Sequence, residues 1–565
     1  MQEKQQTQGS SSRISWQQLA AYGMGGIIPI ALFNIAGQLM GLIGNIGMGL
    51  SAFWLGLIMI IPRLWDAVSD PVMGHFSDNV RTRWGRRRPF LLLGGIGVAV
   101  SFVLMWWVPD GMSDAFQLGY ILVFLLIFFT ACTVFEIPHG ALGMEMSKDP
   151  HERTRLFSAK SFFGNLFAMG TPWLFALANM EVFKGVGGNE VDGMRYVSMM
   201  IAVVLIPLSI WWFMVCKEPG FEEAKKQEKG SFWGNMKTTA SNKTFLRLVV
   251  IIFTLALGFN FVGLLNYYIS IFYLFGGDKA AAGPLLGING TIWAITGLVA
   301  VFPLNWLGRR LGKRSTLGVA ITLMLLAQLS KVFCYNPEIP YLVIIPTVLL
   351  SAGMLMFFTL GSSMLGDICD EDELATGTRS EGSYYSVYWW FLKLGTAFAS
   401  FVTGALIVFS QFDQTQTTTV DGISGKVDLI EQSLKDEKPE AVAPMLEEIQ
   451  GAMVELDAHF KTQGAEFASA SEHYQTLSTE LEVLKSEIGK VETQGAELTW
   501  LESTKASLEN LSLQSPTALL RLRVIEIGLP VVLCIVSLWL LRFYPLTEKR
   551  AYEIKELLEK QREGK

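Results

Sequence analysis

Charged residues are scarce in this sequence. Only 17% of its 565 residues are Asp, Glu, Lys or Arg, against roughly a quarter in an ordinary soluble domain. Hydrophobic residues make up 51% of the chain. Apolar runs of about 20 residues recur along most of it, and each is long enough to cross a bilayer core of about 30 Å. The composition therefore excludes a soluble protein and predicts a chain that crosses a membrane many times.

Cysteine and histidine are scarce as well, with five of each. The cysteines are scattered without paired spacing, so neither a disulfide framework nor a metal-ligand cluster is predicted. The sequence also lacks a nucleophile elbow and a phosphate-cradling glycine loop. An enzyme, a resident cofactor and a nucleic-acid partner are therefore not expected, and the basic loops beside the apolar runs are expected to face lipid headgroups.

Twelve apolar stretches are predicted to span the membrane as helices. They cover residues 18–41, 51–78, 89–108, 117–143, 155–180, 196–216, 246–275, 283–307, 314–335, 340–366, 382–410 and 519–544. Lys and Arg gather in alternate connections, namely 79–88, 144–160, 217–245, 308–314 and the tail after Tyr544. Positively charged loops stay on the cytoplasmic side. Both termini are therefore predicted to be cytoplasmic, in a bacterial inner (plasma) membrane.

A related motif follows the second span and the eighth. The first copy is Trp84-Gly-Arg-Arg-Arg88, and the second is Trp306-Leu-Gly-Arg-Arg-Leu-Gly-Lys-Arg314. This repeat predicts two six-helix halves of the major facilitator type, with the solute site at the midplane between them. The expected segments are a cytoplasmic N-terminus (1–17), the N-terminal half (18–216), a linker (217–245), spans seven to eleven (246–410), an insert (411–518), span twelve (519–544) and a cytoplasmic tail (545–565).

The insert at 411–518 breaks the apolar pattern. It contains 20 Asp and Glu but only seven Lys and no Arg. Leucine and isoleucine recur in it at helical spacing, at Leu477, Leu481, Leu484 and Ile488. The pattern predicts a helical extracytoplasmic domain, which could display a surface to an extracytoplasmic partner. The alternative is a disordered acidic loop.

Ionisable side chains inside the second span point to a cation site. Asp66 and Asp70 are four residues apart and share one helix face, with Arg63 one turn earlier on the same stripe. A charge at the bilayer centre costs about 2.5–3.5 kcal/mol. Two carboxylates one turn apart also repel each other, so a cation, a proton or Arg63 must compensate them. Oxygen ligands suit hard cations, and Ser69 adds a hydroxyl. The sequence predicts binding of Na⁺ or H⁺; the alternative is a structural ion-pair network.

Residues of later spans are candidates for the solute site. Thr133 and Glu136 share one face of the fourth span, and Lys393 in the eleventh is expected to pair with a carboxylate across the cavity. Aromatic rings can stack on the apolar faces of a sugar, although packing in the core is the alternative for each. The other solute candidates are His139, Asn266, Tyr384, Tyr388, Trp389 and Trp390. A charge network that gates the cytoplasmic side is predicted around Asp78 and Arg86.

Several motifs resemble the glycoside–pentoside–hexuronide:cation symporter family, whose members include melibiose permease. They are Arg63–Gly74, Arg83–Pro89, Glu136–Pro138, Asp367–Glu373, Arg379–Ser386, Lys393–Phe398 and Phe543–Lys549. The resemblance covers the chain except 411–518. It implies a coupling-cation site at Asp66 and Asp70 with Thr133 as a hydroxyl ligand, a solute carboxylate at Glu136, and Lys393 near the cation. Arg63 and Arg153 also fall at family positions.

The resemblance does not extend to several of the family's solute-binding residues. The family's sugar-binding aspartate of span one falls near Ile30, its sugar-stacking tryptophan falls at Gly140, and an arginine of span five falls at Ser161 beside Lys160. We therefore expect a cation-coupled symporter of a sugar or glycoside other than a galactoside, working by alternating access. The alternatives are a lipid or amphiphile transporter of the same fold and a membrane receptor or scaffold that displays 411–518.

Overall fold

The computed structural model describes residues 14–80, 82–109, 111–146, 150–218, 242–376, 381–436, 442–467, 470–494 and 498–563. Within these ranges the chain is helical, apart from turns and one isolated bridge between Thr82 and Gly85. The helices are α1 (Trp16–Met24), the π-helix η1 (Ile28–Leu32), α2 (Phe33–Ile46), α3 (Ala52–Asn79), α4 (Arg88–Trp106), α5 (Asp114–Glu145), α6 (Pro150–Ala168), α7 (Thr171–Ala178), α8 (Glu181–Lys184), α9 (Glu190–Val215), α11 (Lys243–Tyr268), the π-helix η3 (Ile269–Leu274), α12 (Lys279–Cys334), the 3₁₀ helix η4 (Pro340–Val343), α13 (Ile344–Thr376), α14 (Glu381–Phe409), α15 (Gln414–Lys435), α16 (Val442–Glu466), α17 (Ser471–Gln494), α18 (Leu498–Leu511), α19 (Pro516–Leu541) and α20 (Glu548–Glu563).

Capping side chains fix where several helices begin. Asn242 precedes α11, and its side-chain oxygen accepts from the backbone N–H groups of Thr244 and Phe245 at 2.9 and 3.0 Å. Asp278 precedes α12 and accepts from the N–H of Ala281 at 2.9 Å. These contacts satisfy N–H groups that have no partner inside the helix.

Ten helical segments among the described residues are long and apolar enough to cross a membrane. They correspond to ten of the twelve predicted spans. The other two, 18–41 and 155–180, are broken helices: α1, η1 and α2 form the first, and α6 and α7 form the fifth. The prediction of an all-α membrane protein is confirmed.

Two helices extend beyond their predicted ends. α9 starts at Glu190 instead of residue 196, and α13 continues to Thr376 instead of ending at 366. The extension of α13 is more polar than the predicted span: Asp367, itself buried beside Ile368, accepts from the Lys313 ammonium at 2.7 Å. Hydropathy marks only the apolar part of a helix, so a polar continuation is missed.

The repeated motifs make equivalent contacts in the two halves. Arg88, at the start of the third span, donates through Nη2 to the Phe213 carbonyl at the end of the sixth, at 2.6 Å. Arg314, at the start of the ninth span, donates to the Arg542 carbonyl at the end of the twelfth, at 2.8 Å. Gly312 just before it has φ 75° and ψ 164°, which divides α12 into spans eight and nine. Both arginines thus hold a C-terminal carbonyl that its own helix leaves unsatisfied.

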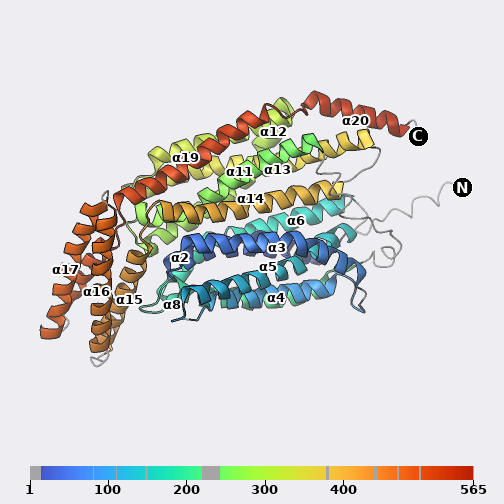
Figure 1. Ribbon diagram of the computed structural model, residues 1–565. Helices are drawn as coiled ribbons and strands as arrows, with labels where there is room; N and C mark the ends of the chain where they lie inside the picture. The colour runs from blue at the N-terminus through green and yellow to red at the C-terminus, as the bar shows by residue number, and fades with distance from the viewer. Residues whose placement is uncertain are drawn as a thin grey trace. The chain divides into compact units, whose positions relative to one another are not determined.

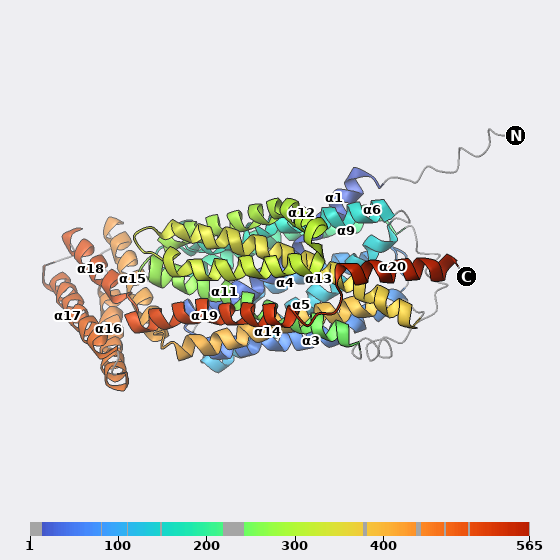
Figure 2. The same cartoon turned by 90° about the horizontal axis from the view of Figure 1, so that it is seen from above.

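The chain divides into two compact units. The first comprises Met1–Gly37, Ile61–Thr171 and Val197–Phe232, and the second comprises Gln38–Ile60, Pro172–Tyr196 and Trp233–Lys565. The second unit therefore contains the predicted C-terminal half, the insert and the predicted extracytoplasmic ends of spans one, two, five and six. In Figures 1 and 2, helices α15–α18 lie at one end of the long helices α11–α14 and α19, and α20 lies at the other end.

The insert is helical, with four helices, α15 to α18, around a core of its own. Ile423, Ile449, Leu481 and Leu508, one from each helix, are among its buried members. Each of the four helices contacts the next, and α18 also contacts α15. The helical alternative for 411–518 is therefore the correct one, because the acidic residues take the outer face and leave an apolar stripe inside.

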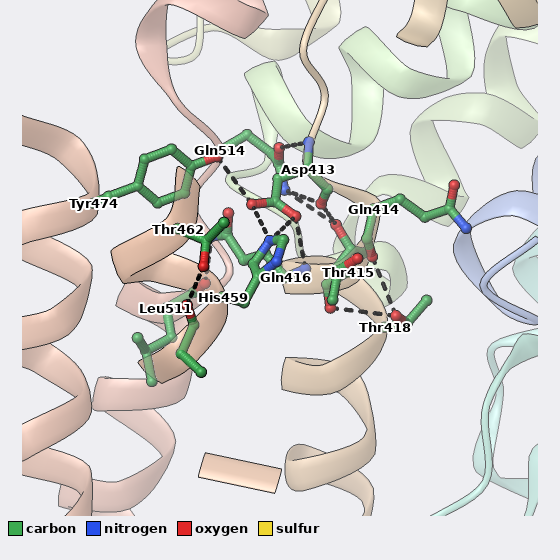
Figure 3. A network of polar contacts seen from close by, with 12 residues as sticks. Asp413, Gln414, Thr415, Gln416, Thr418, His459, Thr462, Tyr474, Leu511 and Gln514 are labelled. Carbon is green, nitrogen blue, oxygen red and sulfur yellow. Dashed lines mark hydrogen bonds and ion pairs between the residues drawn. The ribbon is translucent and has the colours of Figure 1, made fainter. Parts of the chain in front are cut away.

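One aspartate, Asp413, lies where the chain enters this helical bundle and bonds several of its parts (Figure 3). Asp413 caps α15, and its carboxylate accepts from the Tyr474 hydroxyl at 2.9 Å and contacts His459 Nε2 at 2.8 Å. Gln514, next to the start of α19, accepts from the Asp413 N–H at 2.9 Å and donates to the Asp413 carbonyl at 3.0 Å. Entry and exit of the insert are thereby fixed to each other and to α16 and α17.

Candidate cation and solute site

The carboxylates of α3 are held by neighbours in the first compact unit. Arg63 Nη1 lies 3.3 Å from Asp66 Oδ2, and the Thr133 hydroxyl of α5 donates to Asp70 Oδ1 at 2.8 Å. Asp66 is buried, with 2% of its surface exposed, and Asp70 is half-buried. The structure thus brings together Arg63, Asp66, Asp70 and Thr133, four residues predicted for the cation site and its charge network.

This group combines one guanidinium with two carboxylates inside an apolar helix. Arg63 is also fixed against α5, because its guanidinium carbon lies 4.2 Å from the centre of the Phe129 ring. Charges in a membrane interior are costly, and carboxylate oxygens close to a hydroxyl are the kind of ligands that suit a hard cation.

Ser69 adds a further oxygen on α3. It is buried, and its hydroxyl has no hydrogen-bond partner within the described part of the chain. A buried hydroxyl without a partner favours a ligand role. On the adjacent surface, Trp65 Nε1 donates to the Thr130 hydroxyl at 2.9 Å, a second contact between α3 and α5.

Glu136 lies on α5 one turn after Thr133. It is half-buried, and its charge interacts with that of Lys160 on α6, also half-buried. In the sequence Lys160 stood out only as the neighbour of Ser161, because the sequence does not show which residues of spans four and five lie close together. The carboxylate of Glu136 and the ammonium of Lys160 can bind hydroxyl groups of a solute, and the ammonium can also bind an anionic group.

His139 is packed in the core of the first unit. Its ring stacks on Tyr22 at 4.3 Å and on Phe135 at 5.2 Å between ring centres. Nε2 lies 3.0 Å from the Tyr22 carbonyl oxygen, and a Cβ on Gly25 would come within 2.4 Å of the same nitrogen. These contacts support the packing alternative for His139.

The aromatic candidates of the eleventh span occupy different environments on α14. Tyr384 is buried near the start of α14 and its hydroxyl accepts from Asn242 at 3.1 Å, so it ties α14 to α11. Tyr388 is buried and lies against Gly361 of α13. Trp390 is half-buried, and its indole N–H has no acceptor among the described residues, which leaves a donor for a solute.

Trp389 and Lys393 complete the candidates on α14. Trp389 is half-buried and meets the Tyr388 ring edge-on at 6.0 Å. Lys393 is half-buried. Its pairing with a carboxylate of the N-terminal half stays a prediction.

Asn266 leads to a polar cluster that the sequence reading missed. Its side-chain oxygen accepts from the Tyr335 hydroxyl at 3.5 Å. Next to Tyr335, the Lys331 ammonium forms an ion pair with Glu526, and both side chains are almost fully buried. Lys331 and Glu526 lie inside predicted spans, so the rule that singled out Asp66 could also have found them.

On the predicted cytoplasmic side, Glu218 organises the first basic motif. Its carboxylate accepts from the backbone N–H groups of Arg86, Arg87 and Arg88 at 2.6–2.7 Å, at the N-terminus of α4. Negative charge at a helix N-terminus is stabilised by the free N–H groups and the helix dipole. The predicted partners of this network, Asp78 and Arg153, have side chains outside the described part of the structure.

Comparison with known proteins identifies the family. Residues 42–429 match the family described as MFS/sugar transport protein. The chain belongs to this family. It is an integral membrane transporter with the major facilitator fold and not an enzyme, and the resemblance to cation symporters is confirmed.

Individual relatives are distant. The isoprimeverose transporter of Lactiplantibacillus pentosus is 24% identical over 399 residues, 70% of this chain and 80% of that protein. The sodium-dependent lysophosphatidylcholine symporter 1 of Gallus gallus is 33% identical over 138 residues, 24% of this chain and 25% of that protein. Among solved structures, the nucleoside transporter NupG superposes with a TM-score of 0.55 at 12% identity, over 76% of this chain and 99% of NupG, which shows the fold alone.

Proposed function

We propose that this transporter couples the inward movement of one monovalent cation, Na⁺ or H⁺, to uptake of a sugar or glycoside by alternating access. The observation that carries the proposal is the pair of carboxylates on one face of α3, Asp66 and Asp70, with the Thr133 hydroxyl bonded to Asp70. These oxygens supply ligands for one cation. A bound cation lowers the cost of the carboxylate charges in the membrane interior when the site changes the side to which it opens.

The cation supplies the energy for accumulation. One positive charge that moves down a potential of 100 mV releases about 2.3 kcal/mol. At about 1.4 kcal/mol per factor of ten, this supports roughly 40-fold accumulation of a neutral solute.

In this proposal the polar groups of the solute bind near Glu136 and Lys160 of the first unit, whose opposite charges suit hydroxyl groups. In the second unit, the indole N–H of Trp390 has no acceptor among the described residues and is a candidate donor, and aromatic faces suit the apolar side of a sugar ring. The isoprimeverose transporter among the relatives supports a sugar or glycoside. The alternating basic loops support a location in the inner membrane with the insert outside the cytoplasm.

Uptake into proteoliposomes tests the proposal. The purified protein is supplied with a panel of labelled glycosides under an imposed Na⁺ gradient, an imposed H⁺ gradient, or neither. We expect gradient-driven accumulation of at least one glycoside and its loss in Asp66→Asn and Asp70→Asn. The matched control is Asp114→Asn, which removes an exposed carboxylate at the start of α5. Accumulation that persists in Asp70→Asn contradicts the coupling site.

A second candidate solute is a lysolipid. The specific observation is the 33% identity to a sodium-dependent lysophosphatidylcholine symporter over 138 residues. Lysophosphatidylcholine is therefore included in the same panel. Cation-driven transfer of the lysolipid without transfer of any glycoside replaces the sugar assignment and keeps the coupling site. Flux of either solute argues against a role as a receptor or scaffold alone.

A further inference from the structure

The predicted extracytoplasmic ends of both halves pack tightly together in the second compact unit. A Cβ on Gly404 of α14 would lie 2.1 Å from the Ala52 carbonyl oxygen at the start of α3. A Cβ on Gly56 would likewise lie 2.7 Å from the Ser400 carbonyl oxygen. Spans two and eleven are therefore in backbone contact at this end, as glycine allows.

A buried ion pair reinforces this closure. Lys279, the first residue of α12, contacts Glu190 of α9 at 2.8 Å and Asp421 of α15 at 2.5 Å. Lys279 and Glu190 are 8% and 2% exposed. Spans six and eight, one from each predicted half, thus meet through one ammonium group, and the insert supplies its second carboxylate.

The first residue of α15 reaches the loop between spans one and two. The Gln414 amide nitrogen donates to the Gly49 carbonyl, and its oxygen accepts from Asn45 at 2.5 Å. Asn45 is fully buried and also accepts from the Tyr268 hydroxyl of α11 at 2.5 Å. The polar chain therefore joins the insert, span one and span seven.

The middle of α15 lies against the loop between spans five and six. A Cβ on Gly425 would come within 2.4 Å of the Gly187 carbonyl oxygen, and a Cβ on Gly187 within 2.3 Å of Leu429. Gly187 also has φ 76°, a conformation that favours glycine. By contrast, a Cβ on Gly422, one turn earlier on α15, meets nothing within 4 Å. The contact is thus confined to the turn of α15 around Gly425.

The insert is attached to the C-terminal half. It enters from α14 and leaves into α19, and Asp413 and Gln514 bond these two connections to each other. A rocking motion of the two halves therefore carries α15 with the C-terminal half. The contacts of α15 with Gly49 and Gly187 belong to loops of the N-terminal half, so they must break when this side opens.

We propose that α15 is an added gate on the extracytoplasmic side, which clamps the loops after spans one and five and must separate from them before solute enters. The inference rests on the proposed transport by alternating access. Asp421 keeps the charge of Lys279 compensated while the gate opens. Lys279 and Asp421 move together, so Asp421 still compensates Lys279 after Glu190 has moved away.

A labelling experiment measures how readily the gate opens in the absence of a solute. The five native cysteines, all buried and free, are replaced, and Ser400→Cys is introduced at the contact between α14 and α3. The rate of reaction with a membrane-impermeant maleimide, added from outside, reports opening of this side.

Two glycines of α15 form a matched pair of variants. Gly425→Ala forces the added methyl group against Gly187, so the labelling rate should rise about tenfold, because the overpacked contact destabilises the closed state. Gly422→Ala makes the same chemical change in open space and should leave the rate unchanged. Equal rates in both variants overturn the gate. Glu190→Gln, which removes a partner of Lys279 without touching α15, should also raise the rate.

A disulfide that holds the gate closed tests the closed state. A Cβ on Gly49 lies 4.0 Å from the Thr418 Cβ, which is within the range of a disulfide. Oxidised Gly49→Cys/Thr418→Cys should suppress labelling of Cys at 400 and block uptake, and reduction should restore both. Labelling that is unaffected by oxidation overturns the gate. A gate that responds as expected in a protein without flux contradicts the proposed function instead.

Discussion

The Thr133 hydroxyl donates to Asp70 Oδ1 at 2.8 Å, and this bond joins the fourth span to the second at the proposed cation site. A carboxylate has two oxygens with about four acceptor positions, so one bond from a hydroxyl is compatible with a role as a cation ligand. The two helices thus present one shared set of oxygen atoms.

Thr133→Val should weaken the coupling cation. The variant keeps the shape of the side chain and removes the hydrogen bond to a charged group, which is worth about 1.5–3 kcal/mol. We expect the cation concentration for half-maximal uptake to rise about tenfold or more. Thr254→Val is the control, because the Thr254 hydroxyl bonds the carbonyl of Val250 in its own helix, α11. An unchanged cation dependence in Thr133→Val removes this residue from the site.

Glu218→Ala should destabilise the first unit. Glu218 accepts from three successive backbone N–H groups at the N-terminus of α4, and its loss leaves them without that partner. We expect a loss of about 1.5–3 kcal/mol of stability, measured by thermal unfolding of the purified protein in detergent. Lys217→Ala changes the exposed neighbour and should have almost no effect. Similar unfolding midpoints for the two variants would contradict the role of this carboxylate.

Glu526→Gln should be among the most damaging changes in the C-terminal half. It leaves Lys331 charged and buried without its partner, which costs about 3–5 kcal/mol. The double variant Lys331→Met/Glu526→Leu should recover most of this loss, since no charge is then buried. Thermal unfolding of Lys331→Met, Glu526→Leu and the double variant measures the coupling. Additive effects would show that the two side chains do not interact, and Lys461→Met on the exposed face of α16 serves as the reference for a surface pair.

Acid should weaken the insert through His473. Burial lowers the pKa of this histidine below its usual value of 6.5, against a smaller opposing effect of Asp413. The unfolded chain therefore binds a proton more readily than the folded one, so stability is lost as the pH falls below about 6.5. His473→Gln should reduce the fall in the unfolding midpoint between pH 7 and pH 5.

Glu431 provides the control for this pH window. Lys435 and Lys505 lower the pKa of Glu431 to about 2, so its contribution is present above its ordinary value of 4.5 and is lost only between there and about 2. Glu431→Gln should therefore leave the response between pH 7 and pH 5 unchanged. A wild-type response that survives intact in His473→Gln would show that another group titrates there.

Sequence reasoning reached the spans and the pair of carboxylates in the second span because both depend on local spacing. A run of apolar residues has to be about as long as the bilayer is thick, and residues i and i+4 share a helix face in any fold. Asp66, Asp70 and Arg63 could therefore be found from the second span alone. The helical insert was also readable, since its buried leucines follow the helical period.

The missed residues belong to contacts between distant segments. Glu190 lies just outside the predicted sixth span and Lys279 outside the eighth, so neither stood out as an intramembrane charge. Glu218 followed the last apolar residue of the sixth span and read as part of the linker. Lys331 and Glu526 did carry a signal, because each is ionisable and lies within an apolar run.

The sequence by itself determined that this chain crosses a membrane many times, carries two carboxylates on one face of its second span and includes a helical acidic insert. Only the tertiary structure decided that Thr133 bonds Asp70, that Lys331 pairs with Glu526, and that Lys279 meets both Glu190 and Asp421. The physical reason is that helix periodicity acts over a few residues, whereas pairing of buried charges depends on which helices pack together. That choice is made by the whole chain when it folds.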